Sequence, residues 1–329
     1  MQSTPTTAPP VQSRVRSRAA LVLRFPLVRL LLAAMVVSVA ANGTRVVLGS
    51  LGLAAARGAP HRTALMLLGT IATIAVVHVA YLLYVHHIEG RTVTEFAPTS
   101  ALRELGLGTV VGAVLFSLVM LVLLAGGWYG IGGVNPWSVA IPPLLMAAVA
   151  AYVEELVVRG ILFRNLEELF GSWIALAATA LLFGLAHLGN PNATISGAIA
   201  IALEAGVLLA AAFMLTHRLW LAIGIHFAWN FVQGGIFGIP VSGAASEGVL
   251  RGELHGPGLL TGGRFGVEAS AVAVVVCLAA AAILLVMAIR RGGVVAPVWR
   301  RSAAAAGRSR AGAAADISSA SVADAGENP

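Results

Sequence analysis

Three short stretches of this sequence place polar side chains inside apolar segments. The first reads YVEELVVRG at residues 152–160, the second FGLAHLG at 183–189 and the third HFAWN at 226–230. Because polar groups in lipid must find one another, we expect these stretches to meet in one site. Glutamate, histidine and asparagine are side chains that activate water or hold a metal ion. The candidate catalytic residues are Glu154, His187, His226 and Asn230.

The first stretch holds two adjacent glutamates, which are predicted to differ in role. Each ionisable side chain near the centre of a membrane helix costs about 2.5–3.5 kcal/mol on insertion scales. Glu155 and Arg159 are four residues apart, so they share a helix face and can form a structural ion pair. Glu154 points about 100° away from Glu155 around the helix and has no partner there. A lone carboxylate of this kind faces a cavity or another polar residue.

Taken singly, either histidine is more often a packed core residue than a catalyst, so the prediction depends on the joint pattern. His226 and Asn230 are four residues apart and share one helix face. Glu204, in IALEAGVLLA, is a further acid within an apolar run. We expect it to support one of the histidines or Arg159, with a polar contact between helices as the alternative.

The rise of a helix predicts the depth of each residue. Glu154 lies about 15 Å from the end of a helix over 138–164, and His226 about 10 Å from the start of one over 219–238. His187 comes about 22 Å after the start of a helix over 172–189. That depth exceeds those of Glu154 and His226. The three residues can meet only if this helix is tilted or starts nearer the membrane centre.

The elements that position these residues are predicted to be membrane helices. Hydrophobic residues make up 58% of the 329 residues and charged residues 11%, with a mean hydropathy of +0.90. Soluble domains carry about 25% charged residues, so this composition excludes them. The chain has no lysine, and its net charge of +7 comes from arginines near the chain ends and beside apolar runs. This distribution indicates orientation in a lipid bilayer and argues against nucleic-acid binding.

We therefore expect an all-α, polytopic membrane helix bundle of about eight transmembrane helices with a polar site in the membrane. Disordered tails are expected at 1–25 and 292–329, around a transmembrane bundle at 26–291 with its motif core at 140–235. The expected spans are 27–53, 63–85, 106–128, 138–164, 172–189, 195–216, 219–238 and 269–289.

The arginine distribution also predicts orientation. If eight helices alternate, most arginines fall on the side that holds both termini, and positively charged loops are retained in the cytoplasm. Both termini are therefore predicted to be cytoplasmic. A composition rich in alanine, with arginine in place of lysine, indicates a GC-rich bacterial genome and so a bacterial cell membrane.

The three stretches resemble the motifs of the CPBP family of intramembrane proteases, which includes the CAAX prenyl endopeptidases and bacteriocin-processing or immunity relatives. EELVVRG, FGLAH and HFAWN match Glu-Glu-x-x-x-Arg, Phe-x-x-x-His and His-x-x-x-Asn in the same order. The resemblance covers about residues 140–235. It implies a helix bundle with a cavity open toward the cytoplasm or the lipid, and a peptide or protein substrate at the membrane.

The resemblance also implies roles for individual residues. Glu154 would be the general base that activates water, with His187 beside it, while His226 and Asn230 would stabilise the oxyanion. Glu155 and Arg159 would be the supporting pair. Two mechanisms stay open: a zinc or other divalent metal held by Glu154, His187 and His226, or a carboxylate and a histidine that act on water without a metal.

An intramembrane endopeptidase is thus the predicted function. The first alternative is a proton-coupled transporter, in which glutamate and histidine relay protons. The second is a non-catalytic immunity or scaffold relative that keeps the family fold.

Overall fold

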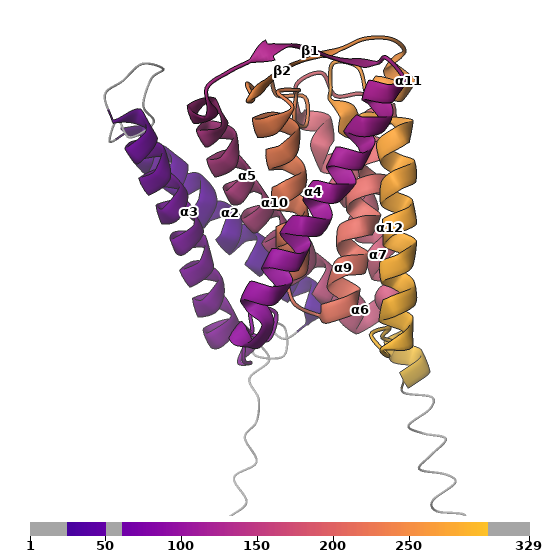
Figure 1. The fold of residues 1–329 in the computed structure, drawn as a ribbon. Coiled ribbons are helices and arrows are strands. Elements are labelled where there is room, and N and C mark those ends of the chain that lie inside the picture. Colours follow the sequence, from indigo (N-terminus) through magenta and orange to yellow (C-terminus); the bar gives the residue numbers. More distant parts are fainter. Residues whose placement is uncertain (1–24, 51–60, 302–329) are drawn as a thin grey trace, which may run out of the picture.

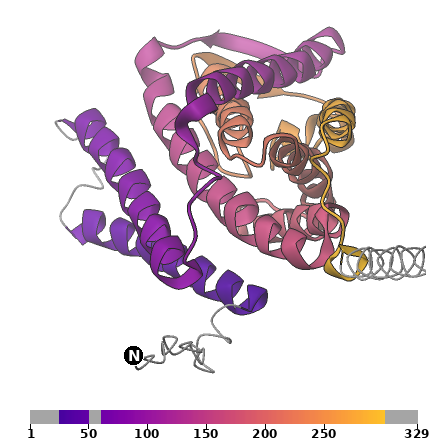
Figure 2. The same ribbon diagram turned by 90° about the horizontal axis from the view of Figure 1, so that it is seen from below.

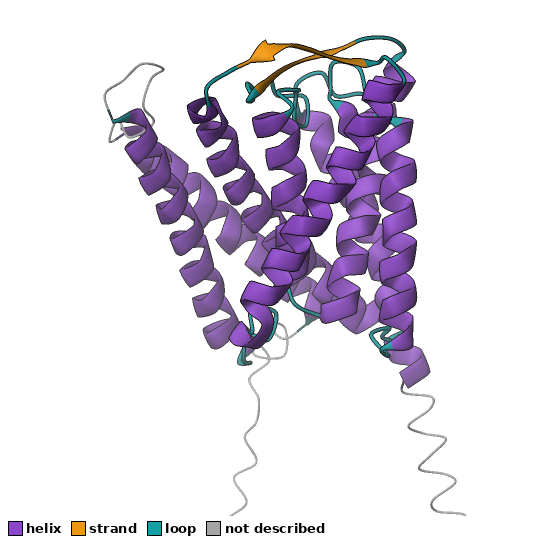
Figure 3. Cartoon of the chain, viewed as in Figure 1, coloured by secondary structure: helices purple, strands orange, loops and turns teal. Residues whose placement is uncertain are grey.

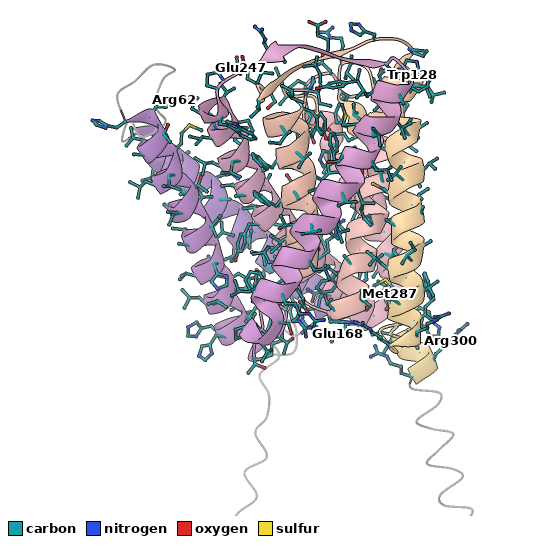
Figure 4. All side chains as sticks on the ribbon, viewed as in Figure 1. Arg62, Trp128, Glu168, Glu247, Met287 and Arg300 are labelled. Carbon is teal, nitrogen blue, oxygen red and sulfur yellow. The ribbon has the colours of Figure 1, made fainter. Side chains whose placement is uncertain are left out.

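The computed structural model describes residues 25–50 and 61–301, which form an upright bundle of helices (Figure 1). A two-stranded ribbon lies across one end of the bundle, which we call the ribbon end (Figure 3). The opposite end, the arginine end, holds Glu168 and Arg300 (Figure 4). The described part of the chain starts and finishes at the arginine end, because Arg29 near the start of the first helix forms an ion pair with Glu168.

Eleven α-helices make up most of the described residues. Residues 25–50 and 61–301 also contain four π-helical turns, in which a backbone N–H bonds the carbonyl five residues earlier instead of four. These turns are η1 (Val85–Glu89), η4 (Leu156–Phe163), η6 (Ala202–Gly206) and η7 (Val232–Ile236). The α-helices are α2 (Pro26–Ser50), α3 (Arg62–Tyr84), α4 (Ala101–Ala125), α5 (Ile141–Glu155), α6 (Arg164–Phe170), α7 (Ser172–Ala186), α8 (Ile195–Ile201), α9 (Val207–Thr216), α10 (Trp220–Phe231), α11 (Gly258–Thr261) and α12 (Ala271–Arg290).

The all-α polytopic bundle predicted from the sequence is confirmed. Six helical segments among residues 25–50 and 61–301 are long and apolar enough to cross a membrane. The other two expected spans are also helical, but α2 has an apolar stretch of only Val28–Thr44, and α10 with η7 is shorter than the six. The last three residues of the expected span 27–53 lie outside the described residues. The six segments are Arg62–Glu89, Pro98–Ala125, Trp137–Phe170, Ser172–Gly189, Ile195–Thr216 and Ala271–Arg290.

Two of the boundaries that differ from the expected ones do so by six residues or more, and each has an identifiable reason. The helix expected at 106–128 begins earlier, because Pro98 starts a 3₁₀ turn that continues into α4; proline suits a first helical turn. The helix expected at 138–164 runs on through η4 and α6 to Phe170. It ends at Gly171, whose φ of 79° is a conformation that glycine adopts without strain.

The ribbon was not anticipated from the sequence. Strand β1 (Tyr129–Val134) pairs antiparallel with β2 (Leu250–Leu254), and Tyr129 faces Leu254 in the register. The two strands belong to two loops that are more than 100 residues apart in the sequence. The ribbon therefore ties the segment before α5 to the segment before α12.

The described chain also extends ten residues past the boundary that we placed at 291. Val295 exchanges two hydrogen bonds with Ser172 at the start of α7, one through each backbone N–H. The ring of Trp299 lies 6.5 Å from that of Phe170. Residues up to Arg301 are thus packed against α6 and α7 at the arginine end.

Seen from below, the composite helix α5–η4–α6 separates two groups of helices (Figure 2). The α2–α3 pair lies on one side, and α4, α9, α10 and α12 lie on the other. Helix α10 packs between α4 and α5. Its position next to α5 is what can bring His226 to the two glutamates.

The contact between α4 and α10 is made backbone against backbone. A Cβ added at Gly112 would lie 2.3 Å from the carbonyl oxygen of Ile225, and one at Gly224 would lie 2.4 Å from that of Leu105. Small residues permit such close approach between membrane helices, where van der Waals packing drives association. We call this contact of Gly112 and Gly224 the glycine seam. It holds α10 in place at Ile225, the residue directly before His226.

We predict that Gly112→Val destabilises the protein, because the added side chain must push α10 away from α4. Overpacking of this kind costs about 1–3 kcal/mol or more. The measurement is the thermal midpoint of unfolding in detergent. Gly106→Val is the matched control, since nothing lies within 4 Å of a Cβ at Gly106. Equal midpoints for the two variants would contradict the proposed seam.

Candidate active site

Glu155 occupies the centre of the site and is completely buried. It is the last residue of α5, directly before the π-helical turn η4. Its Oε1 accepts hydrogen bonds from Nη1 of Arg159 at 2.8 Å and from Nδ1 of His226 at 2.9 Å. The predicted ion pair of Glu155 and Arg159 is therefore present, and the same oxygen also holds a histidine from α10.

Arg159 is also completely buried and has partners on two further elements. Its Nη2 donates to the carbonyl oxygens of Ala205 at 3.3 Å and Gly206 at 3.2 Å. Both carbonyls belong to the π-helical turn η6. The guanidinium also lies 4.8 Å from the ring centre of Phe183 on α7, in a cation–π arrangement. One arginine thus connects α5, α7 and the α8–α9 helix.

Glu154 has different surroundings from its neighbour. Its side chain is 39% exposed, whereas that of Glu155 is 0% exposed. His226 approaches Glu154, with Nε2 of the imidazole 3.8 Å from Oε2 of the carboxylate. This separation is too long for a direct hydrogen bond, but one water molecule can reach both atoms. Since Nδ1 of His226 donates to Glu155, its Nε2 is the nitrogen that faces Glu154.

His187 follows α7 in a short 3₁₀ turn, His187–Gly189. Its Nδ1 donates to the carbonyl oxygen of Phe183 at 2.7 Å, which leaves Nε2 free for chemistry. The sequence placed His187 too deep because it ended the preceding helix at 164. Measured from the turn at Gly171, Glu154 and His187 lie about 25 Å and 24 Å along their helices, at matching depths.

A cleft of about 200 Å³ brings three of the four candidate residues together. Its wall includes Glu154, His187 and Asn230, together with Ser242 and Asn190. His226 lies behind this wall, where it lines a smaller internal cavity with His187 and Asn230. The three sequence motifs therefore converge, although they lie on three separate helices.

The cleft leads toward the ribbon end of the bundle. It shares Pro143, Met146, Ala245 and Ser246 with an outer hollow that is bordered by Arg62 and Glu247. Both of these residues stand at the ribbon end (Figure 4). The expected cavity was one open toward the cytoplasm or the lipid, with both termini in the cytoplasm. This opening lies at the end opposite to the described chain ends, and a second hollow lined by Glu154 lies laterally between α3 and α5.

The internal cavity behind the site is also lined by two acids, Glu204 and Glu268. Glu204 is 2% exposed and hydrogen-bonds the thiol of Cys277 on α12. It was expected to support a histidine or Arg159. The structure places it on the cavity wall that also includes His226 and His187, while Arg159 contacts the carbonyls of the next two residues. The Glu204 side chain does not itself form the contact to Arg159.

Glu268 is the acid that sequence reasoning missed. It lies just before α12, outside the six long spans, and accepts hydrogen bonds from the backbone N–H of Ser242 and from the Gln233 side chain. Burial raises the pKa of Glu268 from 4.5 to about 7. The only sequence signal for it was an acid three residues ahead of the last apolar run. Glu268 is connected to the cleft through its hydrogen bond from Ser242, which lines the cleft. Its position relative to the site therefore depends on how the loop at Ser242 folds.

Glu154, His187 and His226 carry donor atoms of the kind that bind a metal ion. Two imidazoles and a carboxylate have the right chemistry for zinc. In the described part of the chain, however, no group of three His, Cys, Asp or Glu side chains is arranged so that it could hold a metal ion. Glu154 and Nε2 of His226 approach each other, but among the described residues no third donor is arranged beside them. We therefore derive no step through a metal.

The two glutamates should respond differently to substitution. Glu155→Gln removes the charge that pairs with buried Arg159, and breaking a buried pair costs about 3–5 kcal/mol. Glu154→Gln removes a partly exposed acid and should leave stability unchanged or slightly higher. Thermal unfolding in detergent measures both. A stable Glu155→Gln protein beside an unstable Glu154→Gln protein would mean that the two roles are reversed.

We also predict that Glu268 makes stability dependent on pH. The pKa of Glu268 is higher in the folded protein than its ordinary value of 4.5. Its contribution is therefore fully present below about pH 4.5 and is lost as the pH rises through about 7, by up to about 3 kcal/mol. Unfolding midpoints of the wild type and Glu268→Gln should be compared at pH 5 and pH 8. The stability of the variant relative to wild type should increase with pH, and a constant difference would contradict the prediction.

Comparison with known proteins supports the motif assignment. Residues 136–232 match the family described as Type II CAAX prenyl endopeptidase Rce1-like. Comparisons with curated proteins and with solved structures give no match. The matched segment contains Glu154, His187, His226 and Asn230, and it includes α5, α7 and α10. The match at residues 136–232 supports the similarity of this segment to CAAX-protease-like membrane endopeptidases of the CPBP family, and the long apolar helices identify an integral membrane protein.

Proposed function

We propose that this protein is an intramembrane endopeptidase in which Glu154 activates the attacking water. The observation that carries the proposal is the position of Glu154: a partly exposed carboxylate in a cleft, 3.8 Å from a histidine that another carboxylate holds in place. A general base must reach both its water and the substrate. Of the two glutamates, only Glu154 lines the cleft.

The reaction is the hydrolysis of a peptide bond. Glu154 takes a proton from water, and the hydroxide attacks the carbonyl carbon of the substrate. The same proton passes to the leaving amine when the carbon–nitrogen bond breaks. His226 presents Nε2 to the same water and is oriented by Glu155, in the way that a buried carboxylate orients the histidine of a catalytic triad.

Two further residues are assigned to the substrate side of the cleft. The Asn230 amide can donate a hydrogen bond to the oxyanion that develops on the carbonyl oxygen. His187 lies in the same cleft wall with Nε2 free, because its Nδ1 is bonded to Phe183. It is placed to bind the attacking water or the departing amine. Glu155 and Arg159 keep His226 in position and do not touch the substrate.

The proposal is tested by comparing wild type, Glu154→Gln and Glu253→Gln in cells that lack the chromosomal copy. New peptide termini in the membrane and secreted fractions are quantified by terminal labelling and mass spectrometry. Loss of a general base lowers turnover by about 10²–10⁴-fold, so cleavage products should disappear in Glu154→Gln. Glu253 is an exposed residue on β2 and should tolerate substitution, which makes it the matched control.

The result is informative only if the variant folds, so thermal unfolding of Glu154→Gln is measured in parallel. A folded Glu154→Gln protein that still generates the same peptide termini would overturn the assignment of Glu154. Proton flux that depends on Glu154, without any change in peptide termini, would support the transporter instead.

A further inference from the structure

The cleft over Glu154 adjoins two hollows: a lateral one between α3 and α5, which Glu154 also lines, and one that leads away from the described chain ends. The outer hollow that continues the cleft has a volume of about 430 Å³ and is lined by Arg62, Ser138 and Glu247. Ser138 precedes α5, and Glu247 precedes β2. Polar and charged side chains at this position are suited to contact with water. The hollow is therefore an aqueous mouth at the ribbon end, where Arg62 and Glu247 stand in Figure 4.

The arginine end of the same path is closed by buried side chains. The segment 91–97 folds into the bundle there, and Phe96 stacks on Tyr152 with ring centres 5.7 Å apart. Phe96 also meets Trp220 edge to face at 5.3 Å. Beside it, buried Glu95 accepts hydrogen bonds from Arg91 at 2.8 and 2.9 Å. A peptide cannot reach Glu154 from this side without unpacking these contacts.

Arginines of the described residues are unequally divided between the two ends. Cytoplasmic loops carry the excess of arginine and lysine, and acidic residues contribute little to this rule. The ribbon end has Arg62, Arg251 and Arg264, and Arg45 lies near the ribbon-side end of α2. The arginine end has Arg29, Arg91, Arg103, Arg164, Arg218, Arg290, Arg291, Arg300 and Arg301.

From these observations we infer that the ribbon end faces the extracytoplasmic side and that the peptidase cleaves peptide segments exposed there. This inference rests on the proposed function. The substrates are then exported or membrane-anchored proteins with an extended segment at the extracytoplasmic surface of the membrane. Segments at the arginine end would meet the packed contacts of residues 91–97 and are not expected to be cleaved.

The test uses cysteines introduced at the two ends and a membrane-impermeant maleimide. The native Cys277 is completely buried, so the wild-type protein serves as the unlabelled background. Ala245→Cys reports on the cleft and Ser138→Cys on the outer hollow; both positions are exposed. Thr99→Cys, exposed at the start of the α4 segment, is the matched control at the arginine end.

In intact cells, we expect Ala245→Cys and Ser138→Cys to be labelled as completely as in lysed cells. Thr99→Cys should be labelled only after lysis, with at least a tenfold difference between the two conditions. Labelling of Thr99→Cys in intact cells, with protection of the other two, would overturn the inference. Two cysteines at the ribbon end are used so that one poorly folded variant does not decide the outcome.

The same experiment separates this inference from the proposed function. Labelling does not require hydrolysis, so each pattern should be unchanged when Glu154→Gln is added. If peptide termini do not depend on Glu154 while the labelling holds, the function fails and the orientation stands. If they do depend on Glu154 but the cleaved bonds lie on cytoplasmic segments, the inference fails and the function stands.

Discussion

A carboxylate with no access to water, Glu155, receives hydrogen bonds from an arginine on its own helix and a histidine on another. Removing charges from water is costly, and the cost is offset only when each charge is closely paired. The buried ion pair of Glu155 and Arg159 is therefore stable only if α10 stays beside α5 and if the carbonyl oxygens of η6 accept hydrogen bonds from Arg159. The positions of three helices are thus coupled to the ionised state of one residue. The catalytic assignment of Glu154 depends on this arrangement, because His226 reaches it only when Glu155 holds the other side of the imidazole.

The π-helical turns are the local feature that makes this packing possible. Such turns widen the helix by one residue and are frequent at functional sites. In η4 the turn begins immediately after Glu155, and in η6 it exposes carbonyl oxygens that would otherwise be less accessible to a side chain. Arg159 uses them to satisfy part of its donor capacity without water. The site is thus built from backbone irregularities as well as from side chains.

Much of this could be predicted from the sequence, for physical reasons. Hydropathy determined the bundle, since a membrane helix needs a long apolar run. The four-residue spacing determined the pair of Glu155 and Arg159, since an α-helix places such residues on one face. Three motifs in apolar surroundings indicated one shared site, and the structure brings them together.

Other features depend on contacts between distant segments and could not be predicted in this way. The sequence gives no sign of which histidine lies nearest Glu154. It turns out to be His226, because α10 is held between α4 and α5. Glu268 reaches the internal cavity only through the fold of the loop at Ser242. The depth of His187 was misjudged because α6 continues the helix beyond 164, and only the turn at Gly171 shows where the count should start.

The glycine seam between α4 and α10 has a consequence for anyone who wishes to redesign this protein. One face of α10 is occupied by the backbone of its neighbour, so no larger side chain can be installed there. The opposite face already carries His226 and Asn230. Libraries that aim to change which peptides are accepted should therefore leave α10 untouched. They should diversify the loop at 241–247 and the first turns of α5, where the cleft wall consists of short side chains with room to grow.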